Sequence, residues 1–160
     1  MNTQRRDLMR VTAAAIAAVL APRLAAAADA PAVEVWKSPT CGCCGKWIDH
    51  LKANGFAVIA HDVGNLAGWR ERHGMPAKYA SCHTARVGGY TLEGHVPAAD
   101  IKRLLGERPQ AVGLAVPGMP TGSPGMEVDD VRDAYDVLLV LKDGGSRRFS
   151  RYAAANGGRS

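Results

Sequence analysis

The sequence lacks two features that would assign it to large classes of proteins. It has no stripe of lysine and arginine with interleaved aromatic residues, so we expect no nucleic-acid partner. It also lacks an apolar run long enough for a retained membrane anchor, because the apolar segment from Val11 to Leu20 is short and Arg23 interrupts its end. We therefore expect no membrane association once the N-terminal segment has been removed.

The first 28 residues have the features of an export signal. Arg5 and Arg6 precede the apolar segment, and the four alanines at 25–28 supply the small residues that a signal peptidase needs. The arginine pair resembles a twin-arginine signal, and an ordinary Sec signal fits equally well. Removing residues 1–28 takes away four arginines and one aspartate, so the formal net charge falls from +5 to +2. We expect a periplasmic, monomeric protein with one hydrophobic core.

Cysteine is scarce, and its distribution is uneven. Three of the four cysteines are crowded into Cys41-Gly42-Cys43-Cys44. In an oxidising compartment, four cysteines would ordinarily form two structural disulfides. The crowding argues against this interpretation, because at most one of the three could reach Cys82 while the other two paired locally. A dithiol enzyme does not need the third cysteine of a C-x-C-C motif, whereas a third thiolate suits a soft metal.

The cysteine motif lies where a predicted strand gives way to a predicted helix. Residues 33–37 alternate in hydrophobicity, and an apolar stripe at i, i+3, i+4 and i+7 begins at Cys44. Thr40 is the predicted N-cap and Gly55 the predicted stop of this helix. Cys41 and Cys44 would then lie one turn apart at a helix N-terminus, which favours thiolate over thiol. A strand followed by C-x-x-C on a helix is typical of thioredoxins.

The rest of the chain predicts an α/β, thioredoxin-like fold. Further elements are predicted at 56–63, at a short helix capped by Asn65, at 85–90, at 91–96 and at a helix that begins at Pro97. The resulting order, β-α-β-α-β-β-α, is that of a thioredoxin-like core, which we place at residues 29–108. A C-terminal extension follows at 109–152, with a Pro/Gly-rich loop and a terminal β-hairpin over 135–141 and 146–152. Residues 153–160 are predicted to be a mobile tail.

This fold predicts that a distant cysteine joins the motif. In thioredoxin-like folds, the residues just before the third strand lie against the helix that carries C-x-x-C, usually with a cis-proline there. Cys82 and His83 fill that position here. A histidine beside a cysteine at this point favours a metal ligand, because imidazole binds copper and zinc. His95 lies between a strand and a helix. It could approach the same end of the sheet as a ligand, or it could be a structural histidine whose hydrogen bonds are satisfied within the fold.

Other residues carry a weaker signal. Met119 and Met126 lie in the Pro/Gly-rich loop 116–126, where no regular face makes them a core stripe. They either fill gaps under the loop or close over the cysteines, where a thioether suits Cu(I). The remaining histidines have no ligand spacing, and we interpret them as ordinary: His50, which we expect to face solvent, His61 and His73.

Four motifs together resemble the CopG family of periplasmic copper-resistance proteins. They are Ser38–Trp47 (SPTCGCCGKW), Ser81–Thr84 (SCHT), Gly94–Pro97 (GHVP) and Gly118–Met126 (GMPTGSPGM). The resemblance covers roughly residues 33–152. It implies a thioredoxin domain whose extension contributes to metal binding, a cysteine-bridged cluster of several copper ions and interconversion of Cu(I) and Cu(II). By position, it implies the thiolate ligands Cys41, Cys43, Cys44 and Cys82, with His83, Met119, Met126 and, less directly, His95 as accessory ligands.

The residues leave three functions open. A mixed Cys/His/Met shell suits a copper-binding redox protein, which would make the chain a copper oxidoreductase. A thiol–disulfide oxidoreductase would use Cys41 as the attacking thiolate and Cys44 as the resolving thiol. A copper store or chaperone would use the same ligands without turnover. Zinc also fits thiolate and imidazole, but the methionines favour copper. Periplasmic copper efflux or chaperone proteins are the expected partners besides copper itself.

Overall fold

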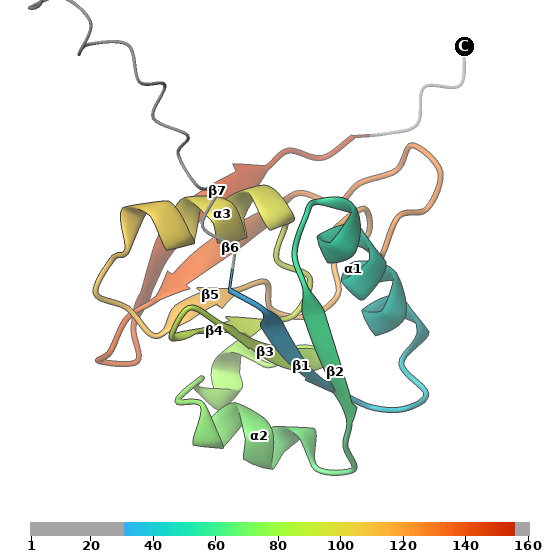
Figure 1. Cartoon of the computed structure of the whole chain (residues 1–160). Coiled ribbons are helices and arrows are strands. Elements are labelled where there is room, and N and C mark those ends of the chain that lie inside the picture. Colours follow the sequence, from blue (N-terminus) through green and yellow to red (C-terminus); the bar gives the residue numbers. More distant parts are fainter. Residues whose placement is uncertain (1–30, 156–160) are drawn as a thin grey trace, which may run out of the picture.

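The computed structural model describes residues 31–155, and within them the chain forms seven β-strands and three α-helices (Figure 1). In chain order, with one short 3-10 turn, the elements are β1 (Val33–Lys37), α1 (Gly42–Ala53), β2 (Val58–Asp62), α2 (Leu66–Arg72), η2 (Ala77–Tyr79), β3 (His83–Val87), β4 (Tyr90–Glu93), α3 (Ala98–Glu107), β5 (Gly113–Ala115), β6 (Tyr135–Val140) and β7 (Ser146–Tyr152). The predicted export signal, residues 1–28, lies outside the described residues, and so does the end of the predicted tail, 156–160.

The strands form one mixed sheet in the order β2-β1-β3-β4-β5-β6-β7. Strand β1 runs parallel to β2 and antiparallel to β3, and β3 runs antiparallel to β4. Figure 1 shows α1 and α3 on one face of the sheet and α2 on the other. The order β1-α1-β2-α2-β3-β4-α3 is that of a thioredoxin-like α/β fold, which confirms the predicted fold class.

The amphipathic stripe predicted for the cysteine helix is buried in the main core. Trp47 and Leu51 of α1 are fully buried, and they belong to the same cluster as Ile101 and Leu104 of α3. Burial of an aliphatic side chain of this size contributes about 1.5–3 kcal/mol, so packing holds α1 in a fixed place on the sheet. No helix within residues 31–155 combines the length and the hydrophobicity that crossing a bilayer requires.

The ends of the cysteine helix are set partly as predicted. Its N-cap is Cys41, which makes no capping hydrogen bond with its side chain, so the prediction of Thr40 is wrong. The Thr40 hydroxyl lies 3.1 Å from that of Ser38 and is engaged within the loop that precedes the helix. At the other end, Gly55 has φ +88° directly after the C-cap Asn54, which confirms the predicted stop.

The predicted strands are present, but their ends differ. The third strand begins at His83, two residues before the predicted start at Ala85, because it pairs antiparallel with β1 as far as Lys37 opposite His83. The second strand is shorter than predicted and covers Val58–Asp62. It lies at one edge of the sheet, and for this reason its apolar Ile59 remains 49% exposed.

The C-terminal extension continues the same sheet. The predicted terminal hairpin is confirmed as β6 and β7, and the three-residue strand β5 lies parallel to β4 and antiparallel to β6. Strand β5 was not predicted, because Gly113–Ala115 is too short to show a period. At the start of the predicted tail, Ala155 exchanges two backbone hydrogen bonds with Arg132, and the mobility of residues 153–160 stays a prediction.

Candidate metal centre

Strand pairing brings the fourth cysteine to the C-x-C-C motif. Cys41 directly follows the loop after β1, and Cys82 directly precedes β3. Because β1 and β3 are antiparallel neighbours with Lys37 opposite His83, the end of β1 and the start of β3 lie side by side at the same end of the sheet. The structure therefore places Cys82 close to the motif, as predicted. The cis-proline that thioredoxin-like folds usually have at this position is absent, since every peptide bond within residues 31–155 is trans.

Four sulfur atoms lie together at this end of the sheet. Cys41 and Cys44 form a disulfide with their Cα atoms 5.4 Å apart, so they face each other across one helical turn as predicted. The Cys43 sulfur lies 3.5 Å from that of Cys41 and 3.9 Å from that of Cys82. All four sulfurs lie within 4.8 Å of one another. Cys44 is fully buried, whereas the other three are partly exposed.

Two histidines form a second group around the same Cys82. Its sulfur lies 3.0 Å from Nε2 of His95 and 3.4 Å from Nδ1 of His83. Both imidazoles are fully buried, and their rings contact each other edge to face. The four cysteines and this Cys/His/His group thus share one sulfur, which makes Cys82 the centre of a mixed set of soft and borderline ligands.

The hydrogen bond of Nδ1 determines which tautomer the neutral His95 ring adopts. Nδ1 lies 2.7 Å from the carbonyl oxygen of Pro124, which can only accept a hydrogen bond. In the neutral ring, Nδ1 therefore carries the hydrogen and Nε2 presents its lone pair to Cys82. A carbonyl that orients an imidazole in this way is a common feature of metal-binding histidines.

His83 has a buried nitrogen without a hydrogen-bond partner. Its ring lies on Trp47, with 4.2 Å between the ring centroids, and its Nε2 finds no partner among the described residues. An unpaired buried polar atom costs about 1–3 kcal/mol and requires an explanation. His83 is a candidate metal ligand, and a residue with that role need not be selected for internal hydrogen bonding.

Burial sets the charges of the site. Burial and, to a smaller extent, the neighbouring His95 together lower the pKa of His83 to about 3. Burial also lowers the pKa of His95, against the opposing effects of the Pro124 carbonyl and Glu127. Burial and the adjacent Cys43 raise the pKa of the Cys82 thiol to about 12. At neutral pH the metal-free site thus holds two neutral imidazoles, the form that binds metals, and a protonated Cys82.

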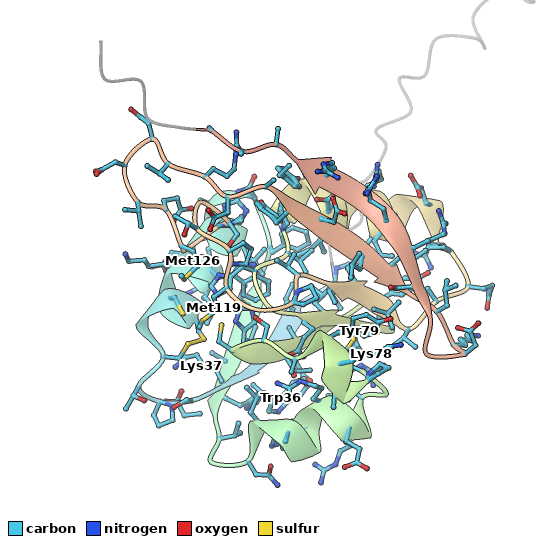
Figure 2. The ribbon with its side chains drawn as sticks, turned by 180° about the vertical axis from the view of Figure 1, so that it is seen from behind. Trp36, Lys37, Lys78, Tyr79, Met119 and Met126 are labelled. Atoms are coloured by element: carbon cyan, nitrogen blue, oxygen red, sulfur yellow. A yellow bond between two sulfur atoms is a disulfide. The ribbon has the colours of Figure 1, made fainter. Side chains whose placement is uncertain are left out.

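The Pro/Gly-rich loop lies over the start of the cysteine helix. A Cβ atom on Gly125 would come 2.8 Å from the Cys43 carbonyl oxygen and 2.7 Å from the Trp47 nitrogen, so only glycine permits this approach. Met126 lines a groove of about 320 Å³ together with Cys43, whereas Met119 is 54% exposed. Figure 2 shows both methionines on the same side of the molecule as the yellow disulfide bond.

The structure corrects one prediction about the remaining histidines. His50 does not simply face solvent, because its Nε2 accepts a hydrogen bond from the backbone nitrogen of Ala98, the first residue of α3. His61 and His73 both lie against Trp36, outside the cysteine cluster. The prediction that these two have no ligand role stays a prediction.

Two contributors to the site could not be recognised from the sequence. The Pro124 carbonyl that orients His95 is a main-chain atom, which has no signature in the identity of the residue. Trp47, which lies on His83, was assigned only to the apolar stripe of α1. The available signal in the sequence was the Pro/Gly-rich composition of the loop; in the structure Gly125 has φ +87° and passes close to the backbone of α1.

Comparisons with known proteins agree with this geometry. Residues 79–126 match a family model described as "Protein of unknown function, DUF411". The solved structure titled "Copper resistance protein copG- Form 1" is 46% identical over 78% of this chain and 98% of its own, with a TM-score of 0.74. Form 2 of that protein is also 46% identical, over 77% and 98% of the two chains, with a TM-score of 0.73. No protein with curated annotation matches the chain significantly.

Proposed function

The chain belongs to the CopG family of copper resistance proteins, and we propose that it binds several copper ions at the end of the sheet where its four cysteines meet. The proposed ligands are Cys41, Cys43, Cys44 and Cys82, with His83, His95, Met119 and Met126 as accessory ligands. The observation that carries the proposal is the position of Cys82, whose sulfur belongs to both the group of four cysteines and the Cys82/His83/His95 group.

The composition of the ligand set favours copper over zinc. A structural zinc site is closed by four ligands, and thioethers add little to it. Here four sulfurs and two neutral imidazoles lie at one place, and Met126 shares a groove with Cys43. A set larger than one tetrahedral shell suits more than one ion, and bridging thiolates suit Cu(I).

A change between Cu(I) and Cu(II) is the activity that this ligand set supports best. Thiolate and thioether prefer Cu(I), whereas imidazole also accepts Cu(II), so a mixed set tolerates a one-electron change. An external dithiol must first reduce the Cys41–Cys44 disulfide, supplying two electrons and two protons and becoming a disulfide itself, before both thiols can contribute. The chain's own residues then orient and protect the ligands: Pro124 fixes the His95 ring, and Trp47 covers His83. Storage or delivery of copper to a periplasmic efflux or chaperone protein would use the same ligands without this change.

A second candidate function is thiol–disulfide exchange. The observation that favours it is the Cys41–Cys44 disulfide at the helix N-terminus, with Cys41 partly exposed and Cys44 fully buried. An attacking thiolate must reach the disulfide of a substrate, whereas a resolving thiol acts only within the protein. This function would not require Cys43, Cys82 or the Pro/Gly-rich loop 116–126, which we call the methionine loop.

Metal analysis of the reduced protein separates these functions. Protein with four free thiols is titrated under anaerobic conditions with Cu(I), with Zn²⁺ and with both. We expect more than one Cu(I) per chain and displacement of zinc by Cu(I). A single zinc ion that Cu(I) does not displace would refute the copper proposal. Reduction of insulin disulfides without stoichiometric copper binding would favour thiol–disulfide exchange instead.

A further inference from the structure

The backbone just before Cys82 lies outside the regular secondary structure. Ser81 and Cys82 connect the η2 turn to the first residue of β3, so the ladder of the sheet does not hold them. Backbone N–H and C=O groups that leave water need partners, and where these partners come from determines how firmly the segment is held. The position of the Cys82 sulfur therefore depends on what binds the main chain of Ser81.

A buried ion pair binds Ser81 on both sides. The Ser81 nitrogen donates to Oε1 of Glu93 at 2.7 Å, and Nη2 of Arg70 donates to the Ser81 carbonyl oxygen at 3.0 Å. Arg70 and Glu93 also contact each other, with Nε 2.9 Å from Oε1. The Ser81 carbonyl belongs to the peptide bond that leads into Cys82. Hence one arginine and one glutamate fix the residue that precedes the shared sulfur.

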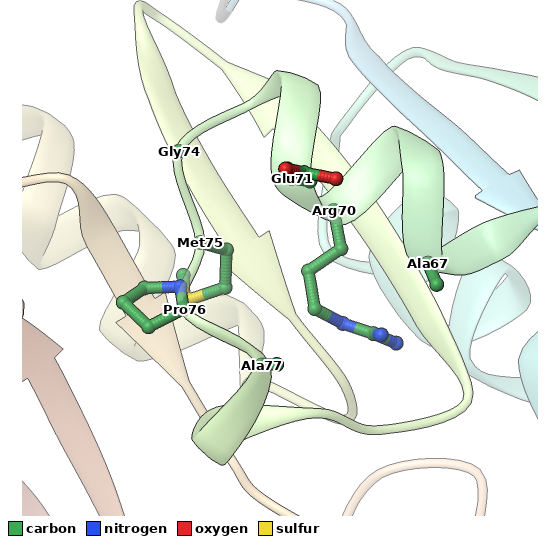
Figure 3. A pocket seen from close by; sticks show the side chains of 7 residues that line it. All are labelled: Ala67, Arg70, Glu71, Gly74, Met75, Pro76 and Ala77. Atoms are coloured by element: carbon green, nitrogen blue, oxygen red, sulfur yellow. The ribbon is translucent and has the colours of Figure 1, made fainter.

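This ion pair is withdrawn from solvent. Glu93 is 0% exposed and Arg70 8%, and the second carboxylate oxygen of Glu93 accepts a hydrogen bond from the Thr84 hydroxyl at 2.7 Å. Figure 3 shows the Arg70 side chain extending from α2 at the edge of a surface pocket that Met75 also lines. The cost of desolvating two charges often cancels their attraction, so burial of such a pair is weak support for a role in stability. Fixing one conformation is the alternative role.

The same pair connects to the other ligand segments. Glu93 ends β4, and after Gly94 the chain reaches His95, whose Nε2 faces Cys82. The Ser81 hydroxyl donates to the carbonyl oxygen of Gly118, the residue before Met119. Cys82, His95 and the start of the methionine loop are thus all joined through Ser81 and Glu93.

We propose that Arg70 and Glu93 are positioning residues of the copper site, which hold Ser81 and thereby place the Cys82 sulfur between the other cysteines and the two histidines. The inference rests on the proposed function, because it assigns these residues a role in the same site. Neither side chain is itself proposed as a ligand. Removing residues that orient metal ligands typically costs about 10- to 100-fold in metal affinity.

The test replaces the pair without leaving a buried charge. The double variant Arg70→Met/Glu93→Gln is neutral, keeps an acceptor for the Ser81 nitrogen and removes the donor to the Ser81 carbonyl. Thr84→Val is the matched control, because it removes one hydrogen bond from the same carboxylate, and the Thr84 side chain makes no hydrogen bond to Ser81. Two quantities are measured: Cu(I) affinity by competition with a chelator, and the rate at which iodoacetamide alkylates Cys82 in the reduced, metal-free protein, with Cys43 as internal reference.

We expect the double variant to bind Cu(I) about 10- to 100-fold more weakly and to alkylate faster at Cys82, and Thr84→Val to match the wild type in both. A folded double variant with wild-type affinity and alkylation, or equal changes in both variants, would overturn the proposal. If the double variant does not fold by circular dichroism, Arg70→Lys decides by the same measurements, because it keeps the charge but cannot bind Glu93 and Ser81 with one planar group. Absence of copper binding by the wild type would refute the proposed function, while the alkylation rates still test the positioning.

Discussion

The sulfur of Cys82 and Nε2 of His95 lie 3.0 Å apart, and this contact joins segments that are distant in the sequence. Cys82 precedes β3 and adjoins Cys43 of α1, whereas His95 follows β4 and is held by the Pro124 carbonyl of the methionine loop. Helix α1, the starting end of β3 and the methionine loop are consequently connected through the contact between Cys82 and His95. A change in any of the three should be measurable in the others.

Replacing Cys43 by serine distinguishes copper binding from disulfide exchange. Serine keeps the size of the side chain but removes a soft ligand that lies 3.5 Å from Cys41 and 3.9 Å from Cys82. We expect Cys43→Ser to lower the number of Cu(I) ions bound per chain while the Cys41–Cys44 disulfide still forms. Cys82→Ser should behave in the same way. Normal copper stoichiometry in Cys43→Ser would contradict the cluster, and the melting temperature of the metal-free variants controls for misfolding.

Copper affinity should increase with pH. The pKa of the Cys82 thiol is raised to about 12, first by burial and then by Cys43, so this group is protonated in the metal-free protein throughout the neutral range. Binding as a thiolate must release that proton, and each proton released raises the affinity about tenfold per pH unit. Competition titrations between pH 6.5 and 8.5, corrected for the chelator, measure the slope. Cys82→Ser should reduce it, and an unchanged slope in that variant would show that Cys82 does not release the proton.

The metal-free protein should lose stability on acidification. His83 has a pKa of about 3 in the folded protein, lowered first by burial, against 6.5 as its ordinary value. Below pH 6.5 the unfolded chain therefore binds a proton that the folded protein does not, and the free energy of unfolding falls towards pH 3. One such histidine contributes a slope of up to about 1.4 kcal/mol per pH unit.

Urea unfolding at pH 7.5 and 5.0 measures this effect. The lowered pKa of His95 acts in the same direction, so some pH dependence should remain without His83. We expect His83→Gln to lose less stability between the two pH values than the wild type. His61→Gln, at an exposed histidine on the edge strand, is the control and should keep the wild-type difference. Equal losses in the wild type and His83→Gln would exclude His83 as a source of the acid sensitivity.

Contact between the methionine loop and α1 can be tested at one glycine. Gly125 has φ +87°, and an added Cβ would come 2.8 Å from the Cys43 carbonyl oxygen. Gly55 has almost the same angle, +88°, with no atom within 4 Å of its Cβ position, so Gly55→Ala is a matched control for backbone strain.

Strain alone should cost the control about 1–2 kcal/mol of stability without weakening copper binding. Gly125→Ala should cost more and should also weaken Cu(I) binding, because the adjacent Pro124 would no longer hold the His95 ring. The comparison combines urea unfolding with the Cu(I) competition titration. Equal copper affinities in the two variants would show that the loop can leave α1 without affecting the site.

The sequence was sufficient to predict the core of the fold and the meeting of Cys82 with the C-x-C-C motif. Alternating and helical periods predicted the element order, and that order places the start of β3 beside the start of α1. Interactions through the main chain were not predictable, as Pro124 illustrates. Arg70 and Glu93 were not recognised either, because charged residues on a short helix and at the end of a strand ordinarily face solvent. Only the long-range partner distinguishes a buried pair from a solvated one.

The sheet register has a consequence for how this site can be altered. Ala115 at the end of β5 lies opposite Leu138 in β6, and β6 begins three residues earlier, at Tyr135, so the connection 116–134 leaves and re-enters the sheet at adjacent strands. A segment whose two ends are held by neighbouring strands can change in length or content while both strands keep their pairing. Within this connection the methionine loop can therefore be varied as long as Pro124 and Gly125, which hold His95 and approach α1, are kept: histidine or carboxylate in place of the Met119 and Met126 thioethers would offer a different metal preference on an unchanged set of cysteines.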